Sequence, residues 1–463
     1  MNLLDTIAAI STPFGKGGVA VIRISGENAI NIAEKIFKPI SKKPLSEYES
    51  FRAVYGGIYT NIENKEIQID DGLATIFRAP RSFTGENTVE ISCHGGVLVT
   101  GKVLTACLMA GARHATAGEF TRRAFVNGKM GLNEAEALGS LLEAETDEQV
   151  YISRAGMKGI LSAKTGDIYS SLCSVLASVF AHIDYPDEDL ADLSEDEMAE
   201  MIEDAKNKLS ALADTYRTGR AVTGGINTVI LGKTNAGKSS LYNLLVGSDA
   251  AIVTDIEGTT RDVISEKIKL GRVMVKLSDT AGIRESGDVV EKIGIDRAKN
   301  AAENAELVLA VFDGSKAPTL DEYKLCEYIK SLSGIKVALI NKSDVGYCEE
   351  YNEICADFEY SLHISAREGV GRDELVSMLE EIYIDKNLDT GNDAVIVNAR
   401  QHAAVVGALD ALSNALLSIK GGFPLEICCA DIEEAMQSLA SIDGRAISED
   451  IVSEIFSKFC VGK

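Results

Sequence analysis

The spacing of hydrophobic residues divides the chain into four segments, of which the first two differ sharply. In residues 1–125, short β-rich runs at 17–24, 71–77 and 88–94 alternate with helical stretches and Gly or Pro turns, which predicts an α+β domain. From 126 to 221, apolar residues recur at i, i+3 and i+4 in sequence rich in Ala, Leu and Glu. This second segment is predicted to be helical.

Residues 222–387 return to an alternation of strands and helices. Their apolar, β-branched runs NTVILG, VMVKLSD, LVLAVFD, KVALINK and YSLHIS are typical of strands that are covered on both faces of a parallel sheet. Residues 388–463 are again predicted to be helical, over 399–417 and from Asp431 onward. We therefore expect a helical domain that is interrupted by an inserted α/β domain.

The acidic run at 184–205 lies in the first helical segment. Ser194 precedes a turn rich in Asp and Glu, which predicts a helix N-cap followed by favourable charge. The run is interpreted as a solvated helix face.

Charge is distributed unevenly along the chain. The 463 residues include 46 Lys and Arg against 70 Asp and Glu, so the net charge is −24, yet residues 1–125 alone carry +2. Each phosphate contact needs a Lys or Arg, so this composition excludes a whole-chain polycation that wraps nucleic acid or an anionic membrane. Any anion must be bound locally.

The nine cysteines are scattered, with no CxxC pair and no metal-ligand spacing. This pattern predicts reduced thiols and a cytoplasmic location. The first residues lack the pattern of a secretion signal, and no 18-residue uncharged apolar run occurs, so neither secretion nor membrane spanning is expected.

The segment GKTNAGKSS at 232–240 fits the phosphate-binding pattern G-x-x-x-x-G-K-[ST]. It follows a predicted strand and precedes a predicted helix, so backbone N–H groups and the helix dipole can both face a phosphate. Lys238 would reach the β- and γ-phosphates and Ser239 would bind Mg²⁺. The residues expected around the phosphates are Asn235, Ala236, Gly237, Lys238, Ser239 and Ser240.

Three further motifs follow predicted strands in the order of a guanine-nucleotide site. Asp279 of DTAG can hold Mg²⁺ through water, and the N–H of Gly282 can contact the γ-phosphate. Asp344 of NKSD can accept hydrogen bonds from N1 and the exocyclic amine of guanine, and SAR would lie beside the base. The site residues expected from these motifs are Asp279, Thr280, Ala281, Gly282, Asn341, Lys342, Asp344, Ser365, Ala366 and Arg367.

The polar, Gly-containing segment TDIEGTTRD at 254–262 is expected to be a nucleotide-dependent switch. Thr260 is the candidate second hydroxyl on Mg²⁺. Arg261 has two interpretations, an arginine finger in cis or an ion pair with Asp262, and the ion pair is favoured. The switch residues expected at the nucleotide are Thr254, Asp255, Ile256, Glu257, Gly258, Thr259 and Thr260.

The whole chain closely resembles the MnmE (TrmE) family of tRNA-modification GTPases. The resemblance rests on the motifs above together with DTIAAISTPFGKGGVAVIRISG, SFTGENTVEISCHGG, AGEFTRRAFVNGKMGL, DVVEKIGI and the terminal FCVGK. It implies an α+β domain that dimerises and binds 5-formyl-tetrahydrofolate, followed by a helical domain that the GTPase domain interrupts.

The resemblance also implies the folate contacts, which by motif position are Arg23, Glu90, Lys129 and Lys463. The chemistry is consistent, because a folate carries a glutamate tail suited to Arg or Lys and a pterin edge suited to a carboxylate. Without the resemblance, Arg23 and Lys129 would be interpreted as surface charges and Glu90 as a strand-edge residue.

In the family, a K⁺ ion replaces an arginine finger in GTP hydrolysis. By resemblance, the K⁺ ligands would be the side chain of Asn235 and, mainly through backbone oxygens, Thr254, Ile256 and Thr259. Glu291 matches the glutamate that orients the attacking water; the alternative is a carboxylate at a helix N-terminus.

Three candidate residues or pairs outside the nucleotide motifs have competing interpretations. Cys460 of the terminal motif is favoured as a functional thiol over an inert near-terminal cysteine. His94 and the pair Cys428 and Cys429 are interpreted as packing residues.

The implied activity is that of a homodimeric GTPase that works with MnmG. Together they would install a carboxymethylaminomethyl or aminomethyl group at C5 of wobble uridine 34 of certain tRNAs, with FAD and NADH in the partner and a heterotetrameric or larger complex. Because the chain is acidic, we expect the partner to make most tRNA contacts. The alternative is a ribosome-assembly or regulatory GTPase switch, against which the missing basic RNA-binding domain argues.

Overall fold

The structure is a computed structural model with two compact units. The first comprises Met1–Gly139 together with Ala440–Lys463, and the second comprises Ser140–Leu439. The residues that the structure describes are 5–63, 65–184, 193–247, 265–278 and 300–463.

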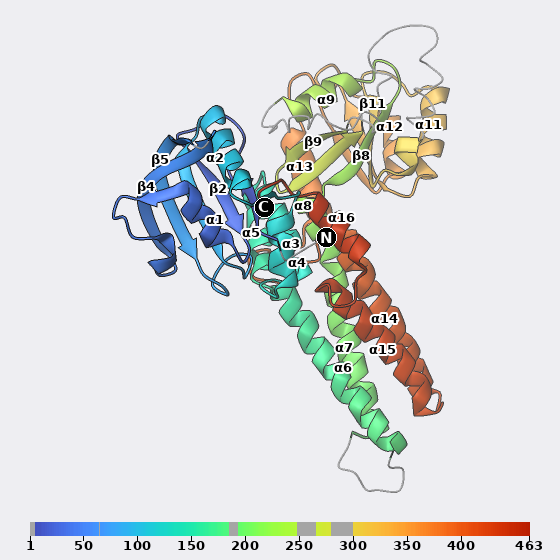
Figure 1. The fold of residues 1–463 in the computed structure, drawn as a ribbon. Helices are drawn as coiled ribbons and strands as arrows, with labels where there is room; N and C mark the ends of the chain where they lie inside the picture. The colour runs from blue at the N-terminus through green and yellow to red at the C-terminus, as the bar shows by residue number, and fades with distance from the viewer. Residues whose placement is uncertain (1–4, 64, 185–192, 248–264, 279–299) are drawn as a thin grey trace. The chain divides into compact units, whose positions relative to one another are not determined.

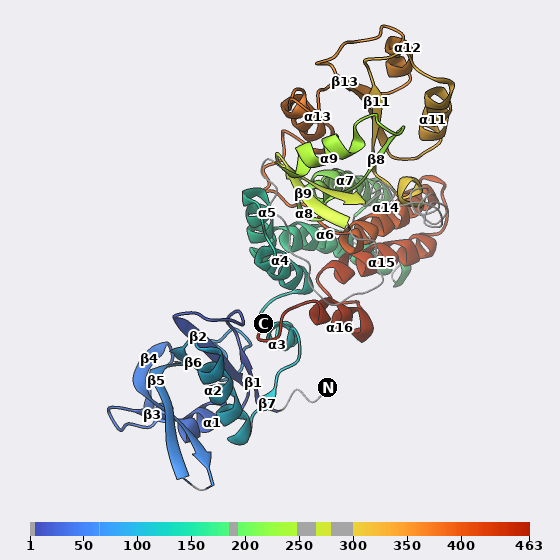
Figure 2. The same ribbon diagram turned by 90° about the horizontal axis from the view of Figure 1, so that it is seen from above.

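The first unit is built on a seven-stranded sheet with strand order β3-β4-β5-β6-β2-β1-β7. Neighbouring strands are antiparallel except for the short parallel pair β1 and β7. Helices α1 and α2 contact each other and pack on the sheet (Figure 2). The elements are β1 (Ile7–Ile10), β2 (Val19–Ser25), α1 (Ala29–Ile36), β3 (Phe37–Pro39), a 3₁₀ turn (Leu45–Glu47), β4 (Arg52–Ile62), β5 (Lys65–Phe77), β6 (Thr88–His94), α2 (Val97–Met109), β7 (Arg113–His114), α3 (Glu119–Val126), α4 (Leu132–Leu142) and α16 (Glu449–Ser457).

The α+β prediction for this part of the chain is confirmed, because all three expected β-rich runs are strands. Along β2, Ala20, Ile22 and Ile24 are buried in the core between sheet and helices, whereas Val21 and Arg23 are half-buried on the other side. This alternation with a period of two residues fixes which strand face carries the chemistry. The long hairpin of β4 and β5 was not predicted, since the first half of β5 is mostly exposed and polar.

Long helices dominate the sequence on both sides of the α/β part of the second unit. Helix α7 packs against α6 and α14 (Figure 1). Ser194 caps α7 as predicted. Its side chain accepts a hydrogen bond from the N–H of Glu197, and the side chain of Glu197 accepts one from the N–H of Ser194. The helices are α5 (Asp147–Met157), α6 (Ile160–Asp184), α7 (Glu195–Asp214), α8 (Tyr216–Thr223), α14 (Ala399–Lys420) and α15 (Leu425–Ile442).

Helix α14 is, among the described residues, the one helix long and apolar enough to cross a membrane by length and composition alone, with a mean hydropathy of 1.4. The sequence-based expectation of no membrane span did not identify this helix. Its Val405, Ala408 and Leu412 are buried within the unit. A helix that packs in the core of a globular unit meets the same criterion of length and composition. The feature is therefore weak evidence for a membrane span.

The second unit contains a six-stranded sheet with strand order β13-β12-β11-β8-β10-β9. All neighbouring strands are parallel except β9, which pairs antiparallel with β10 at the edge. The elements are β8 (Ile226–Gly232), α9 (Lys238–Val246), β9 (Ser265–Leu270), β10 (Val273–Ser278), β11 (Leu307–Asp313), α11 (Leu320–Lys330), β12 (Ile335–Asn341), α12 (Tyr351–Ala356), β13 (Tyr360–His363) and α13 (Arg372–Tyr383).

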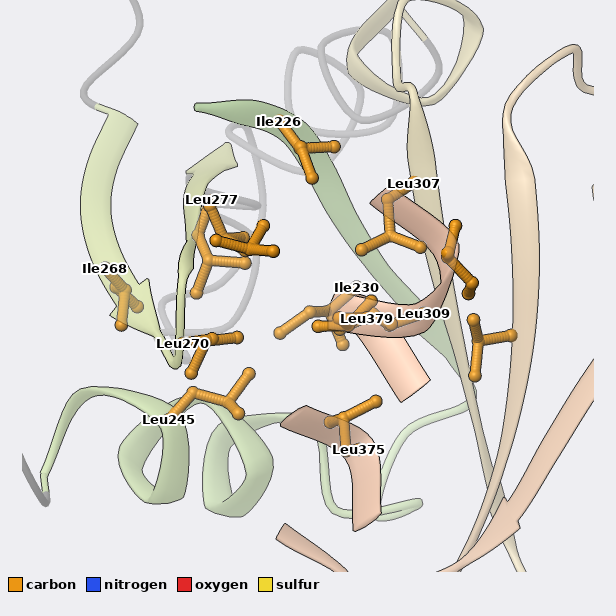
Figure 3. Packing of buried hydrophobic residues seen from close by; sticks show 14 of the residues in the cluster. Ile226, Ile230, Leu245, Ile268, Leu270, Leu277, Leu307, Leu309, Leu375 and Leu379 are labelled. Carbon is orange, nitrogen blue, oxygen red and sulfur yellow. The ribbon is translucent and has the colours of Figure 1, made fainter. Parts of the chain in front are cut away.

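Packing on both faces explains why the strands of this sheet are so apolar. On one face, Leu245 of α9 and Leu375 and Leu379 of α13 pack with strand residues such as Ile230 and Leu309 (Figure 3). A second cluster, which includes Val308 and Phe312 together with residues of α11 and α12, covers the other. The predicted parallel sheet is confirmed except for its antiparallel edge strand β9.

Candidate functional site

The phosphate-binding loop joins β8 to α9 through two residues with left-handed backbone. Asn235 has φ 65° and Gly237 has φ 103°, and Asn and Gly are the residues that most readily adopt this conformation. A Cβ on Gly237 would lie 2.0 Å from Nδ2 of Asn341. The glycine is therefore required both by its backbone and by the close approach of a second loop.

Lys238, the first residue of α9, folds back over this loop. Its Nζ donates to the backbone oxygens of Gly232 and Lys233, both at 2.8 Å, and burial lowers its pKa. Ser239 and Ser240 follow in the first helical turn and are exposed. A loop of N–H groups, an ammonium and a hydroxyl at a helix N-terminus is suited to a polyphosphate with its Mg²⁺.

Asn341 at the end of β12 connects the phosphate-binding loop to the predicted base-binding loop. Its Nδ2 donates to the backbone oxygen of Ala236 at 2.8 Å, and its Oδ1 accepts from the N–H of Ala366 at 2.9 Å. The residue is 3% exposed. Three of the sequence-predicted motifs thus meet at one buried amide.

The base-binding loop is held by a second contact. The hydroxyl of Ser365, which is 1% exposed, donates to Oδ1 of Asp344 at 2.6 Å. This contact fixes the carboxylate that is predicted to recognise guanine. Arg367 of the same motif does not converge on the site, since its side chain is 84% exposed and lies 3.6 Å from the carboxylate of Glu368.

Asp313, which the sequence analysis did not identify, lies at the end of β11 and holds Lys342. The Nζ of Lys342 is 2.6 Å from Oδ2 of Asp313. Burial raises the pKa of Asp313, but the hydrogen bonds from Lys342 and Ser315 outweigh it, so its pKa is lowered overall. The available signal was a carboxylate at the carboxyl end of a strand in a parallel sheet, where ligands bind.

Several predicted site residues lie outside the described residues. They are Thr254, Asp255, Ile256, Glu257, Gly258, Thr259, Thr260, Arg261, Asp279, Thr280, Ala281, Gly282 and Glu291.

A second candidate site lies on the sheet of the first unit, where Arg23 and Glu90 are cross-strand partners in β2 and β6. The Nε of Arg23 is 2.8 Å from Oε1 of Glu90. The guanidinium also lies over two aromatic rings, 5.3 Å from the centre of Phe83 and 5.6 Å from that of Phe120. Charged and aromatic groups therefore adjoin on this face of the sheet.

Lys129 lies against the loop that carries Phe83. Its Nζ donates to the backbone oxygen of Pro80 at 3.0 Å, and its stem lies beside Gly85. Since Phe83 packs against Arg23, one loop connects these two predicted folate contacts.

The terminal segment 460–463 docks on the same domain. The N–H of Phe120, in the first turn of α3, donates to the oxygen of Lys463 at 3.2 Å. The oxygen of Cys460 accepts from Gly118 at 3.4 Å, while the Cys460 residue is exposed. Phe120 thus contacts both the tail and Arg23.

A buried ion network supports α3. Arg123 is 1% exposed and donates to Asp5 at 2.8 Å, to Glu119 at 3.0 Å and to Glu86 at 3.1 Å. Arg113 also binds Asp5 and Glu119, and its hydrogen bond is the main cause that lowers the pKa of Asp5. In Glu119, burial is the largest single effect and raises the pKa, but the hydrogen bonds from Arg113, Thr116 and Arg123 together lower it overall. The network was not predicted, because Asp5 and Glu86, which complete it around Arg113, Glu119 and Arg123, lie far away in the chain.

The packing interpretation is wrong for His94 and confirmed for Cys428 and Cys429. His94 ends β6 with a side chain that is 71% exposed, and its Nδ1 is 2.8 Å from the carboxylate of Asp70. This hydrogen bond raises the pKa of His94. Both cysteines are buried.

The fold and the nucleotide-site geometry define a class of protein. A strand, glycine loop and helix at the centre of a parallel sheet, joined by Asn341 to the two base-binding motifs, identify a P-loop GTPase. In the part of the chain that the structure describes, no three His, Cys, Asp or Glu side chains form a separate metal-binding group.

Comparisons with known proteins give the family. A model described as the MnmE helical domain matches residues 132–460, and one described as the GTP-binding protein TrmE N-terminus matches residues 6–129. A relative named tRNA modification GTPase MnmE from Acetivibrio thermocellus is 40% identical over 99% of both chains. Another of that name from Clostridioides difficile is 37% identical over 100% of both. The chain belongs to the MnmE family.

A comparison with solved structures found a more distant neighbour. An Era variant from Aquifex aeolicus, bound to GDP and AlF4⁻, is 26% identical over 40% of this chain and 65% of that chain, with a TM-score of 0.28. The assignment does not depend on it.

Proposed function

We propose that this protein hydrolyses GTP during tRNA modification and works with MnmG to install a carboxymethylaminomethyl or aminomethyl group at C5 of wobble uridine 34. The observation that carries the proposal is the full-length match to relatives named tRNA modification GTPase, in a chain whose nucleotide loops are joined by a buried Asn341. Residues 222–387 are the GTPase domain in this proposal, and residues 1–125 are the folate-binding domain.

Hydrolysis is assigned to groups around the phosphate-binding loop. Lys238 and the N-terminus of α9 bind the phosphates, Ser239 and Thr260 bind Mg²⁺, and Asn235 contributes to a K⁺ site with Thr254, Ile256 and Thr259. The exposed, left-handed Asn235 supports this, since its side chain is not used within the protein core. Glu291 would orient the attacking water, and a K⁺ ion held by these residues would supply positive charge beside the β- and γ-phosphates.

Exchange of the monovalent cation tests this assignment. Turnover measured at constant ionic strength should be much higher in KCl than in NaCl, and Asn235→Ala should remove most of the difference. Equal turnover in both salts would contradict the K⁺ site while leaving GTP binding intact.

The one-carbon donor is proposed to be 5-formyl-tetrahydrofolate, bound by Arg23, Glu90, Lys129 and Lys463. Support comes from the convergence of Arg23 and Glu90 with Phe83, a half-buried ring that can stack on a flat pterin, while the buried ring of Phe120 packs behind Arg23. Cys460 is assigned to the modification step because its tail docks on the same domain through Phe120.

Calorimetric titration with 5-formyl-tetrahydrofolate tests the folate site. The protein should bind it, Arg23→Gln should weaken binding strongly, and Arg52→Gln, which removes an exposed arginine from β4, should leave binding unchanged. No binding by the unaltered protein would contradict the folate assignment.

The protein is proposed to be a cytoplasmic homodimer that contacts tRNA mainly through its partner. The reason for assigning the tRNA contacts to the partner is electrostatic, because a chain with a net charge of −24 on the whole repels the phosphates of a nucleic acid. The isolated protein should bind tRNA weakly and in a strongly salt-dependent way. Tight binding at physiological salt would contradict this division of contacts.

A further inference from the structure

The segment 313–322, which runs from the last residue of β11 through the connecting loop into the first turn of α11, contacts both nucleotide-binding loops. At its start, Asp313 binds Lys342 of the base-binding motif. At its end, the Nζ of Lys233 in the phosphate-binding loop donates to Oγ1 of Thr319 at 3.0 Å and lies 3.3 Å from the carboxylate of Asp321. None of the predicted site residues belongs to this loop.

The Asp313 carboxylate is held in place from both sides. Oδ1 accepts from the hydroxyl of Ser315 at 2.6 Å and from its N–H at 3.2 Å, while Oδ2 accepts from Lys342 at 2.6 Å. The Asp313 side chain is 16% exposed and that of Lys342 is 32% exposed. A carboxylate with this many donors is a fixed anchor for the ammonium group.

Asp313 bears on nucleotide binding because its partner Lys342 lies within the base-binding motif. Lys342 lies between Asn341, which is pinned under the phosphate-binding loop, and Asp344, which is pinned by Ser365. Its backbone is left-handed, with φ 68°. Because its ammonium reaches Asp313 at the end of the neighbouring strand, its alkyl stem spans the carboxyl edge of β11 and β12, where nucleotides bind in such sheets.

We propose that Asp313 is a positioning residue for nucleotide binding, which acts by holding the stem of Lys342 as a wall against the purine ring. The methylene groups of the stem can pack on any purine ring, and they form no hydrogen bond that distinguishes one base from another. Asp313 therefore strengthens binding of guanine and hypoxanthine nucleotides equally, whereas Asp344 distinguishes them through the exocyclic amine that only guanine has.

The test is release of fluorescent methylanthraniloyl GDP and IDP from the full-length protein by stopped flow. Asp313→Asn should accelerate release of both by about 10-fold, the effect of weakening one charge-assisted hydrogen bond. The preference for GDP over IDP should stay unchanged. Asp344→Asn, in contrast, should reduce that preference.

A double-mutant cycle with Lys342→Met shows whether Asp313 acts through Lys342. Methionine keeps an alkyl chain but has no ammonium, so Asp313→Asn should add little in the Lys342→Met background. Asp357→Asn is the matched control, because it makes the same substitution at an exposed carboxylate that pairs with Lys330 of α11 instead of Lys342, and should change release by less than about twofold.

Two results would overturn the proposal. One is unchanged release from Asp313→Asn. The other is full additivity of Asp313→Asn and Lys342→Met, which would show that Asp313 affects the loop without acting through Lys342. Asp313→Glu, which restores a carboxylate, should recover part of the slow release.

Discussion

Replacing Asn341 with alanine should remove the hydrogen bonds that join the phosphate-binding loop to the base-binding loop. Asn341 is 3% exposed, and its side-chain amide satisfies two backbone groups, the oxygen of Ala236 at 2.8 Å and the N–H of Ala366 at 2.9 Å. A buried group left without its partner costs about 1–3 kcal/mol. If the freed loops relax into water, nucleotide must reorder both loops when it binds.

Taking about 1.5 kcal/mol for each group, the loss of binding free energy is about 3 kcal/mol, or about 100-fold in the Kd for GDP. Methylanthraniloyl GDP is a suitable probe, because the chain has no tryptophan to interfere. Amide hydrogen exchange at Ala366 should accelerate in the same variant.

Asn341→Asp distinguishes the contributions of the two hydrogen bonds that the Asn341 side chain makes. Its carboxylate can still accept from Ala366 but cannot donate to Ala236, so exchange at Ala366 should stay slow while nucleotide binding weakens. A Kd for Asn341→Ala within about threefold of the unaltered protein, a difference below 1 kcal/mol, would refute the argument that this amide joins the loops.

Three further perturbations have definite expected outcomes. Gly237→Ala places a Cβ 2.0 Å from a buried amide nitrogen at φ 103°, so nucleotide binding should be lost, and binding close to normal would contradict the close approach. Gly462→Ala places a Cβ 2.0 Å from the backbone oxygen of Ile10, at a residue whose φ is 99°. The tail should therefore detach, and amide hydrogen exchange at the Phe120 N–H should accelerate. Unchanged exchange would contradict docking of the tail. The hydrogen bond to Asp70 raises the pKa of His94 above 6.5, so the ion pair stabilises the fold below pH 6.5 and is lost as pH rises through the raised pKa. An NMR titration midpoint above 6.5 that falls in Asp70→Asn is expected, and an identical midpoint in both proteins would argue against the pair.

The features predicted correctly from sequence are those whose determinants are local. The phosphate-binding loop needs only a strand, a glycine loop and a helix in succession, all of which lie within 226–246. The cap at Ser194 likewise depends on residues three positions apart. Apolar β-branched runs identified the buried strands, because both of their faces are covered.

Features that depend on distant partners were missed. Arg123 reaches Asp5 across 118 positions, and Asp313 meets Lys342 across 29. Neither pair has a local signal beyond a charge beside apolar sequence. Strand β9 was also missed, since SEKIKL is half charged, as an edge strand can be.

The error at His94 was avoidable from sequence. Along β6, Val89, Ile91 and Cys93 are buried, so the alternation of a strand directs His94 outward. Its pairing with Asp70 could not be foreseen, because it depends on the register of β5 beside β6.

The most direct test of the proposed function is a nucleoside analysis of tRNA by mass spectrometry. Cells lacking the gene should lose the C5 modification of wobble uridine 34, the unaltered gene should restore it, and a Lys238→Ala variant produced at the same level should not. Intact modification in the deletion strain would contradict the role in tRNA modification, and full restoration by Lys238→Ala would contradict its dependence on GTP.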